Sequence, residues 1–422
     1  MKILLVGGGS GGHVTPIIAI AKKLYQCDSH NEIIIWTDKK FLAQTLSLAH
    51  SELPSRVKIE CISSGKLRRY ANLNFWYKYF SWYHLTHTHL PNLIDTKRVI
   101  SGFVQSWIKL RHLQPDVIFC KGGYVCLPVG LAAHGLHLPM VIHDSDTVPG
   151  LSNRVLARFA NAIATGSPIE NYPNYPRKIT KFVGIPVRAE FKKLDDRSRR
   201  DVKKSIGLDP QKKLIFVAGG GGGATIFSTI FRKIAPKLIA DFNVQIFLLA
   251  GKGSGFDVGS DLKRDFIVKD FITTEYPDLL NACDIFVTRA GATSLAEAAV
   301  SATTTIIIPS PYLAGDHQTK NAAIFAKAGA AIDLRQNVTE DHFDERLSQE
   351  LFDNIAKLLR PDGLRRRVQL GENLAKFAKK DALDAIVDMI TQEGRRRETL
   401  RQHYVAAATK IADNSVARKD RK

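Results

Sequence analysis

Residues 1–24 read MKILLVGGGSGGHVTPIIAIAKKL. The unbroken apolar run that ends at Val6 predicts a parallel strand over Lys2–Val6, buried on both faces. Five of the next six residues are glycines, and an amphipathic helix then extends to about Leu24. Such a turn suits phosphate, because glycines let the backbone approach an anion and the helix N-terminus stabilises its charge. This opening predicts a Rossmann-like α/β domain.

The chain repeats the opening about half its length later. Leu214–Ala218 is again an apolar run, glycines fill 219–223, and a second amphipathic helix is expected to end near Leu238. Two such openings predict two Rossmann-like domains side by side. The length agrees, because 422 residues exceed what one hydrophobic core usually supports.

Short β-rich runs alternate with segments of helical length, which predicts right-handed βαβ units and doubly wound parallel sheets. The expected strands are Lys2–Val6, Ile33–Trp36, Val57–Ile62, Asp116–Cys120, Met140–His143, Ala162–Thr165, Leu214–Ala218, Val244–Ala250, Phe266–Lys269, Asp284–Thr288 and Thr304–Pro309. We expect an N-terminal domain over 1–184 and a C-terminal domain over 185–375. A last helix over 376–393 is expected to pack back on the N-terminal domain, before a basic, disordered tail over 394–422.

The composition indicates the compartment of the protein and the kind of partner that it meets. Five scattered cysteines without a CxxC pair favour reduced thiols inside the cell over disulfides or a zinc site. No window approaches 18 uninterrupted apolar residues, so no bilayer-spanning helix is expected. The formal net charge is +19; eight basic residues face one acid in 66–112 and nine face three in 395–422. This clustering predicts a polyanion met at particular surfaces: phosphate groups, anionic lipid or nucleic acid.

His13 follows the first glycine turn directly. Pro16 fits the first turn of a helix, which places His13 at the helix N-terminus. That position disfavours the imidazolium, so the ring is expected to be neutral and able to accept a proton. A histidine that merely caps the helix is the alternative. The glycine turn alone is a weak signature of NAD or FAD, and Asp38 fits only loosely the place of their ribose-binding acid.

Two polar clusters follow strands in the second half. The segment from Arg289 to Glu297 opens a helix, and Glu297 lies one turn beyond Thr293, where a carboxylate can accept both hydroxyls of a ribose. Gln318 and Asn321 open the next helix and can read sugar hydroxyls together. Each cluster alone is more often a solvated helix start, but together at strand ends they favour a ligand crevice.

Four motifs together resemble the MurG family: GGSGGHVTP at 8–16, GGYV at 122–125, RAGATSLAE at 289–297 and DHQTKN at 316–321. The resemblance extends from Lys2 to about Thr391. It implies a GT-B fold, in which two Rossmann-like domains face a cleft. It also implies metal-free, inverting transfer of N-acetylglucosamine (GlcNAc) from UDP-GlcNAc to undecaprenyl-diphosphate-muramoyl-pentapeptide (lipid I), giving lipid II. The enzyme would work as a peripheral protein on the cytoplasmic face of the cell membrane, without a cofactor.

The resemblance also implies roles for single residues. His13 would be the base that deprotonates the acceptor 4-hydroxyl, a duty that Asp144 or Asp146 could share. The acceptor and its diphosphate would meet Gly11, Gly12, Gly122, Gly123, Tyr124, Asp144 and Asp146. UDP-GlcNAc would meet Ser10, Gly12, Arg188, Gly220, Gly221, Ile272, Arg289, Gly291, Ala292, Thr293, Glu297, Gln318 and Asn321.

Some positions depart from the family pattern. Gly221 and Gly222 replace the usual serine and glutamine of the second glycine loop, so backbone N–H groups must serve there. The run HDSD at 143–146 stands where the family usually has His-Glu-x-Asn, and Ile185 where Asn is usual. This run also matches a DxD metal pattern, but its place in the first domain favours an acceptor contact or a solvated loop.

Aromatic residues crowd the stretch 70–83, with Lys78 among them, Arg68 and Arg69 before it and Lys97 and Arg98 after it. Rings beside cations suit the bilayer interface, where they meet headgroups and anionic lipid. The alternative is a helix that packs its aromatics onto the first domain. Nucleic acid is not expected as a partner, because no RNA- or DNA-binding module is recognisable.

Three other functions share parts of this pattern: a GT-B transferase with another lipid acceptor, a UDP-sugar 2-epimerase, and a non-catalytic subunit that binds UDP-sugar. The glycines at 221–222 and Asp146 encourage the last of these. The joint presence of His13, Glu297 and Gln318 argues against a decayed site.

Overall fold

The computed structural model describes residues 1–67, 89–220, 225–251, 259, 262–272, 274–337 and 344–419, with side chains as far as residue 400. The aromatic stretch 70–83, with Arg68, Arg69 and Lys78, and the glycines 221–223 lie outside the described residues. The membrane and donor-loop predictions that concern these residues therefore stay predictions.

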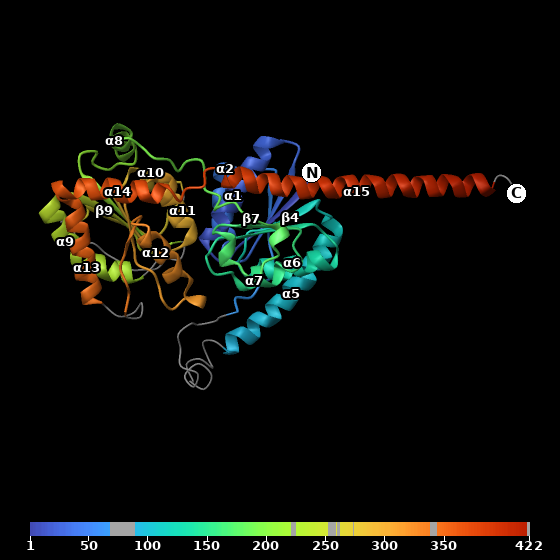
Figure 1. The fold of residues 1–422 in the computed structure, drawn as a ribbon, viewed down its shortest axis with the longest axis horizontal. Helices are drawn as coiled ribbons and strands as arrows, with labels where there is room; N and C mark the ends of the chain where they lie inside the picture. The colour runs from blue at the N-terminus through green and yellow to red at the C-terminus, as the bar shows by residue number, and fades with distance from the viewer. Residues whose placement is uncertain are drawn as a thin grey trace.

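Two parallel sheets form two domains that lie side by side (Figure 1). The first sheet has the order β3-β2-β1-β4-β5-β6-β7, and the second β10-β9-β8-β11-β12-β13. The strands are β1 Lys2–Val6, β2 Glu32–Thr37, β3 Lys58–Cys61, β4 Val117–Cys120, β5 Met140–Asp144, β6 Ala162–Thr165, β7 Thr180–Phe182, β8 Lys213–Ala218, β9 Val244–Leu249, β10 Phe266–Lys269, β11 Ile285–Thr288, β12 Thr305–Ile307 and β13 Ile332–Asp333. The doubly wound α/β architecture predicted from the sequence is confirmed.

Helices cover both faces of each sheet. The α-helices are α1 Gly11–Cys27, α2 Leu42–Glu52, α5 Leu90–Leu113, α6 Cys126–Gly135, α7 Leu151–Leu156, α8 Asp196–Ser205, α9 Thr225–Phe242, α10 Tyr276–Ala282, α11 Ala292–Ser301, α12 His317–Lys327, α13 Glu345–Leu359, α14 Leu364–Ala375 and α15 Ala382–Lys419. Burial on two faces explains the unbroken apolar strands: Ile3 and Leu5 enter one core of the first domain, and Leu4 and Val6 the other.

All eleven predicted strands are present, within two residues of their expected ends. β7 and β13 were not predicted. Both are edge strands of three and two residues, too short and too polar to show a buried-strand pattern. The predicted domain boundary at 184/185 falls in the segment between β7 and α8.

The last helix, α15, packs against the first strand of the chain, β1. Ile386, Val387 and Ile390 enter the same core as Ile3 of β1, so the predicted return of this helix to the first domain is confirmed. The helix continues to Lys419, through the segment where the sequence favours a basic, disordered tail, and projects from the body (Figure 1). The segment has no proline and many good helix formers, which outweighs its charge.

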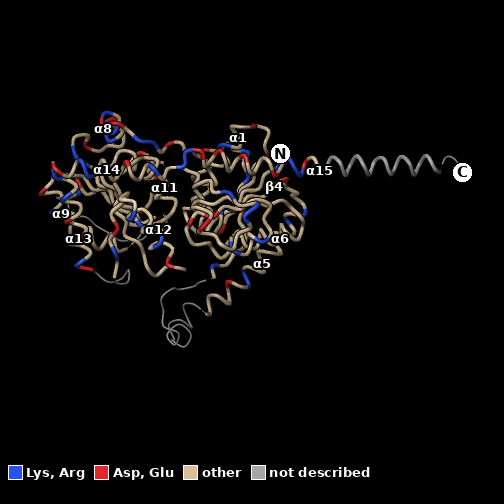
Figure 2. Tube along the Cα trace, in the orientation of Figure 1, with Lys and Arg blue, Asp and Glu red and all other residues tan. Residues whose placement is uncertain are grey.

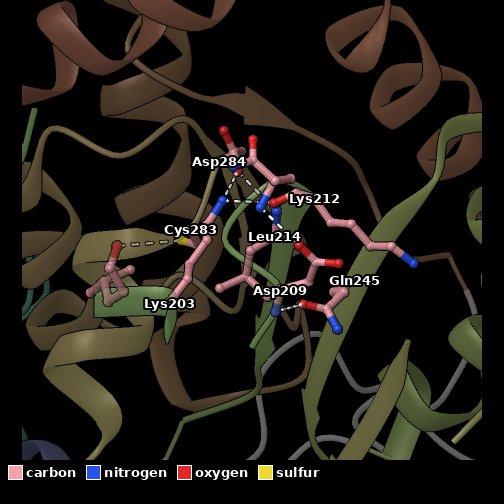
Figure 3. Close-up of polar contacts among 9 residues, drawn as sticks. Lys203, Asp209, Lys212, Leu214, Gln245, Cys283 and Asp284 are labelled. Atoms are coloured by element: carbon pink, nitrogen blue, oxygen red, sulfur yellow. Dashed lines mark hydrogen bonds and ion pairs between the residues drawn. The ribbon is translucent and has the colours of Figure 1, made fainter. Parts of the chain in front are cut away.

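A polar cluster joins the amino ends of two neighbouring strands in the second sheet (Figure 3). Lys203 of α8 donates from Nζ to Asp284 Oδ2 (2.9 Å) and to the carbonyl of Lys212 (2.9 Å). The same carboxylate oxygen accepts from the backbone N–H of Leu214 (2.8 Å). The cluster lies at the amino ends of the strands, whereas ligands of such sheets bind beyond the carboxyl ends. We therefore interpret the cluster as structural.

We expect Asp284→Asn to lower the free energy of unfolding of this domain by about 3 kcal/mol, because it leaves the buried Lys203 ammonium without its carboxylate. The measurement is the urea midpoint of unfolding. The control is Glu345→Gln, which breaks the exposed Lys233–Glu345 pair and should leave the midpoint unchanged. Equal midpoints for the two variants would contradict a structural role for the cluster.

Candidate functional site

A cleft of about 490 Å³ lies between the two domains. From the first domain it is lined by Gly11, Gly12, Thr15, Lys40, Phe41, Ala43, Gln44, Ser47 and Leu48. From the second it is lined by Arg188, Ala218, Gly220, Leu249, Gly251, Asp270, Phe271, Ile272, Tyr276, Thr293, Ser294 and Glu297. Seven predicted site residues share this one cleft: Gly11, Gly12, Arg188, Gly220, Ile272, Thr293 and Glu297. The wall formed by α2 was not predicted, because its residues carry no motif.

The first glycine turn is closed by Asp38 at the end of β2. Asp38 is buried, and its Oδ2 accepts from the backbone N–H of Gly9 (2.6 Å) while Oδ1 accepts from that of Lys40 (2.9 Å). Gly9 needs to be glycine, since its φ is +83° and an added Cβ would lie 2.8 Å from the Tyr124 ring. Asp38 therefore holds the loop itself, which weakens the dinucleotide interpretation of this turn.

The structure brings His13 against the second predicted acceptor loop. An added Cβ on Gly122 or Gly123 would lie 3.2 Å from carbon atoms of the His13 ring. Gly123 has φ +85°, and its added Cβ would lie 2.1 Å from the carbonyl oxygen of Gly8. The glycine loops that follow β1 and β4 therefore pack backbone to backbone. The ring of His13, which belongs to the first turn of α1, lies against the second loop.

His13 is held in its neutral form. Its Nδ1 is buried and has no hydrogen-bond partner among the described atoms. Burial, assisted by the nearby charge of Lys121, lowers the pKa of His13 to about 3. A ring that is neutral throughout the physiological range can accept a proton from a hydroxyl.

Lys121 is a charged site residue that the sequence analysis missed. It directly follows β4 and precedes Gly122, is 1% exposed, and donates from Nζ to Ser145 Oγ (2.5 Å). Burial lowers the pKa of Lys121 to about 8, against the opposing charges of Asp144 and Asp146. The available signal was a lysine that closes an apolar strand immediately before a pair of glycines.

Asp144 and Asp146 are engaged by the protein. Asp144 Oδ2 accepts from Tyr175 Oη (2.8 Å) and from the backbone N–H of Gly150 (3.1 Å), and burial raises the pKa of Asp144 to about 6. Asp146 Oδ1 accepts from Asn321 Nδ2 (3.1 Å), across the domain boundary. Neither carboxylate is among the described residues that line the cleft.

On the second-domain side of the cleft, Glu297 lies in the middle of α11. It is 6% exposed, and burial raises its pKa to about 8, although the charge of Arg188 opposes the shift. Arg188 in turn donates to Glu52 Oε1 of α2 (2.9 Å). Thr293 Oγ1 donates to the carbonyl of Gly12 (3.1 Å), so the N-termini of α1 and α11 meet across the cleft.

Other predicted donor residues lie beside the cleft rather than in its wall. Arg289 is buried and donates to the carbonyl of Ile308 (2.9 Å) and to Gln336 Oε1 (2.7 Å). Gln318 Oε1 accepts from the backbone N–H of Ser310 (2.9 Å). Gly291 and Ala292 begin α11, and Ser10 is the N-cap of α1.

The chain resembles known glycosyltransferases over most of its length. Residues 3–165 match the glycosyltransferase family 28 N-terminal domain, and residues 214–381 match the glycosyltransferase family 28 C-terminal domain. The UDP-N-acetylglucosamine–N-acetylmuramyl-(pentapeptide) pyrophosphoryl-undecaprenol N-acetylglucosamine transferase of Shouchella clausii (strain KSM-K16) is 33% identical. That match covers 83% of this chain and 91% of the relative.

Solved structures share the fold. The MurG of Acinetobacter baumannii has a TM-score of 0.60 at 20% identity, over 93% of this chain and 99% of its own. A UDP-GlcNAc 2-epimerase from Neisseria meningitidis has a TM-score of 0.61 at 11% identity, over 93% and 100%. At these identities the likeness shows the fold alone, which is GT-B. On the matches of both domains and the identity to its relatives, the chain belongs to glycosyltransferase family 28 and, within it, to the MurG family.

Proposed function

We propose that the chain transfers GlcNAc from UDP-GlcNAc to the 4-hydroxyl of the muramoyl sugar of undecaprenyl-diphosphate-muramoyl-pentapeptide, with inversion. The observation that carries the proposal is the shared cleft, in which the N-terminus of α1 meets that of α11 through the Thr293–Gly12 hydrogen bond. One wall carries Glu297 for the donor ribose, and the neutral base His13 follows directly after Gly12.

In the proposed reaction, His13 takes the proton of the acceptor hydroxyl while its oxygen attacks C1 of GlcNAc. The bond between C1 and the phosphate oxygen breaks, and its electron pair leaves with UDP. The backbone N–H groups at the two helix N-termini face the cleft where this charge develops, so they stabilise the transition state more than the ground state. The alternative base is Asp144, whose pKa is about 6; to take the proton, its carboxylate would have to leave the bonds from Tyr175 and Gly150.

We propose that the reaction needs no metal ion, since helix N-termini and Arg188 supply positive charge beside the donor site. The test is transfer of radiolabelled GlcNAc from UDP-GlcNAc to a short-chain lipid I analogue in the presence of EDTA. Turnover is expected. No transfer despite tight UDP-GlcNAc binding would move the assignment to another lipid acceptor or to a non-catalytic subunit. Interconversion of the UDP-sugar without transfer would indicate an epimerase.

We further propose peripheral binding at the cytoplasmic face of the membrane, through α5. This helix exposes an apolar stripe at Leu93, Ile100, Val104 and Ile108, each at least half exposed. Basic residues recur along the same helix, which extends from the first domain (Figure 2). Such a helix suits the headgroup region of an anionic bilayer. None of the described helices is long and apolar enough to span a membrane.

We expect the double variant Ile100→Glu/Ile108→Glu to weaken sedimentation with phosphatidylglycerol vesicles about tenfold or more, because it removes two apolar side chains from the bound face. The matched control is Leu364→Glu/Val368→Glu, which changes two equally exposed apolar residues of α14 in the other domain. Equal binding of both variants would exclude α5 as the membrane face.

A further inference from the structure

The loop after β5 reaches from the first domain into the second, where it meets Asn321 on the first turn of α12. Asn321 is 3% exposed. Its Nδ2 donates to Asp146 Oδ1 (3.1 Å) and to the carbonyl of Ala290 (3.0 Å). Its Oδ1 accepts from the backbone N–H (3.2 Å) and from Oγ1 (2.8 Å) of Thr147. Three of the four bonds cross between the domains.

These bonds occupy the whole side chain of Asn321. A side-chain amide has two N–H donors and one oxygen with two lone pairs, so four partners fill its capacity. A sugar hydroxyl can reach this amide only after one of the bonds opens. In the state described here, Asn321 therefore ties the domains together instead of waiting for a ligand.

The loop itself is firmly held from the first domain. Tyr172 Oη donates to the carbonyl of Asp146 (2.6 Å), and Tyr175 Oη donates to Asp144 Oδ2 (2.8 Å). Lys121 Nζ donates to Ser145 Oγ (2.5 Å) from a fully buried position. The first-domain end of the interdomain contact is thus held by bonds within its own domain, which lowers the entropic cost of the contact.

Charges of opposite sign lie close together around the loop. A buried ammonium is costly unless opposite charge lies near it, and here Asp144 and Asp146 both raise the pKa of Lys121 against the effect of burial. Position 146 holds a carboxylate where the family pattern has a neutral amide, so this chain has an added negative charge beside its buried cation. The Asp146 carboxylate also accepts the bond from Asn321, which links these opposite charges to domain closure.

We propose that residues 144–147 form an interdomain clasp that closes the cleft by holding Asn321, and that Lys121 is the positioning residue that keeps the clasp in place. The clasp sets the ratio of closed to open cleft before any substrate binds. The clasp proposal rests on the proposed function at one point: Asn321 must be released from the clasp before its amide can contact the donor sugar.

The test measures the distance between the domains without ligand, by energy transfer between two dyes. One dye is placed on Cys27, the exposed native cysteine, and the other on α13 through Lys357→Cys, with the partly exposed Cys61 replaced by serine. Thr147→Val keeps the shape of the side chain but removes its hydroxyl bond to Asn321. We expect it to lower the closed-to-open ratio about two- to tenfold. The matched control is Thr229→Val, whose hydroxyl bonds within α9 and should leave the ratio unchanged.

Lys121 is tested by compensation. Lys121→Met should open the cleft by removing the cation, and Lys121→Met/Asp146→Asn should recover most of the closed population. The double variant restores the net charge that the wild type has at this site, and an amide oxygen at 146 can still accept from Asn321. If Thr147→Val had the same interdomain distance as Thr229→Val, the proposal of a clasp would be overturned. A double variant no more closed than Lys121→Met would overturn the role of Lys121.

Should Lys121→Met fail to fold by circular dichroism, Thr147→Val still decides whether the clasp exists, and Ser145→Ala, which removes the hydroxyl that accepts from Lys121 Nζ, takes the place of Lys121→Met. A Ser145→Ala variant no more open than the wild type would then mean that Lys121 does not position the clasp. Because the readout needs no substrate, failure of the clasp leaves the transferase assignment standing. Absence of transfer, conversely, leaves the clasp standing.

Discussion

His13→Ala is expected to lower the turnover of GlcNAc transfer by about 10²- to 10⁴-fold, the usual cost of losing a positioned general base. Donor binding should change little, because the His13 ring faces Gly122 and Gly123 while Gly11, Gly12 and Thr15 line the cleft. The measurements are turnover at saturating substrates and UDP-GlcNAc affinity by calorimetry. His13→Gln, which keeps a polar side chain of similar size but no base, should fail equally.

The pH dependence of turnover gives a second test of His13 as the base. Because the pKa of His13 is about 3, its imidazole stays neutral well below pH 6. The turnover at saturating UDP-GlcNAc should therefore stay level from pH 8 down to about 6.5, where an imidazole of ordinary pKa would be half protonated. A His13→Ala variant within tenfold of the wild type would assign the base to Asp144 or Asp146 instead.

The second large effect concerns Glu297. Its buried carboxyl has a pKa of about 8, so it is mostly protonated at pH 6 in the empty cleft. Two ribose hydroxyls donating to the carboxylate would favour its ionised form, and UDP binding would then release a proton. We expect the affinity for UDP to rise between pH 6 and pH 8, with a limiting slope of about tenfold per pH unit. Calorimetry in two buffers of different ionisation enthalpy measures the released proton.

Glu297→Gln should abolish this pH dependence and lower the affinity at pH 8 by about ten- to a hundredfold, the range expected for hydrogen bonds to a charged group. Asp270→Asn, which changes another carboxylate of the cleft, is the matched control and should keep the pH dependence. A proton release that survives in Glu297→Gln would place the titrating group elsewhere.

The same shift predicts a stability effect. The pKa of Glu297 is raised above its ordinary value of 4.5, so its contribution to folding is full below about pH 4.5 and is lost as the pH rises to about 8. Bound UDP offsets this loss by stabilising the ionised form. Added UDP is therefore expected to raise the melting temperature more at pH 8 than at pH 6.

The parts predictable from sequence were those with a local pattern. The apolar run at Lys2–Val6 and the glycines after it predicted the first strand, the turn and the start of α1, because each depends on neighbouring residues. Lys121 was missed because its partner Ser145 comes from another strand. Asn321 was predicted at the site, but its ties to Asp146 and Thr147 depend on contacts 174 or more residues apart, which no local pattern contains.

The course of α15 has a consequence for how this chain is made. The core around β1 is completed by Ile386, Val387, Met389 and Ile390, which leave the ribosome long after β7, the last strand of the first domain. At about 5–20 residues per second, the first domain waits on the order of 10–40 s after its own residues emerge. During that interval its apolar groove is open to chaperones. A chain that ends before Ala382 never fills the groove, so truncation before this residue should yield a protein that is degraded rather than one that is merely shorter.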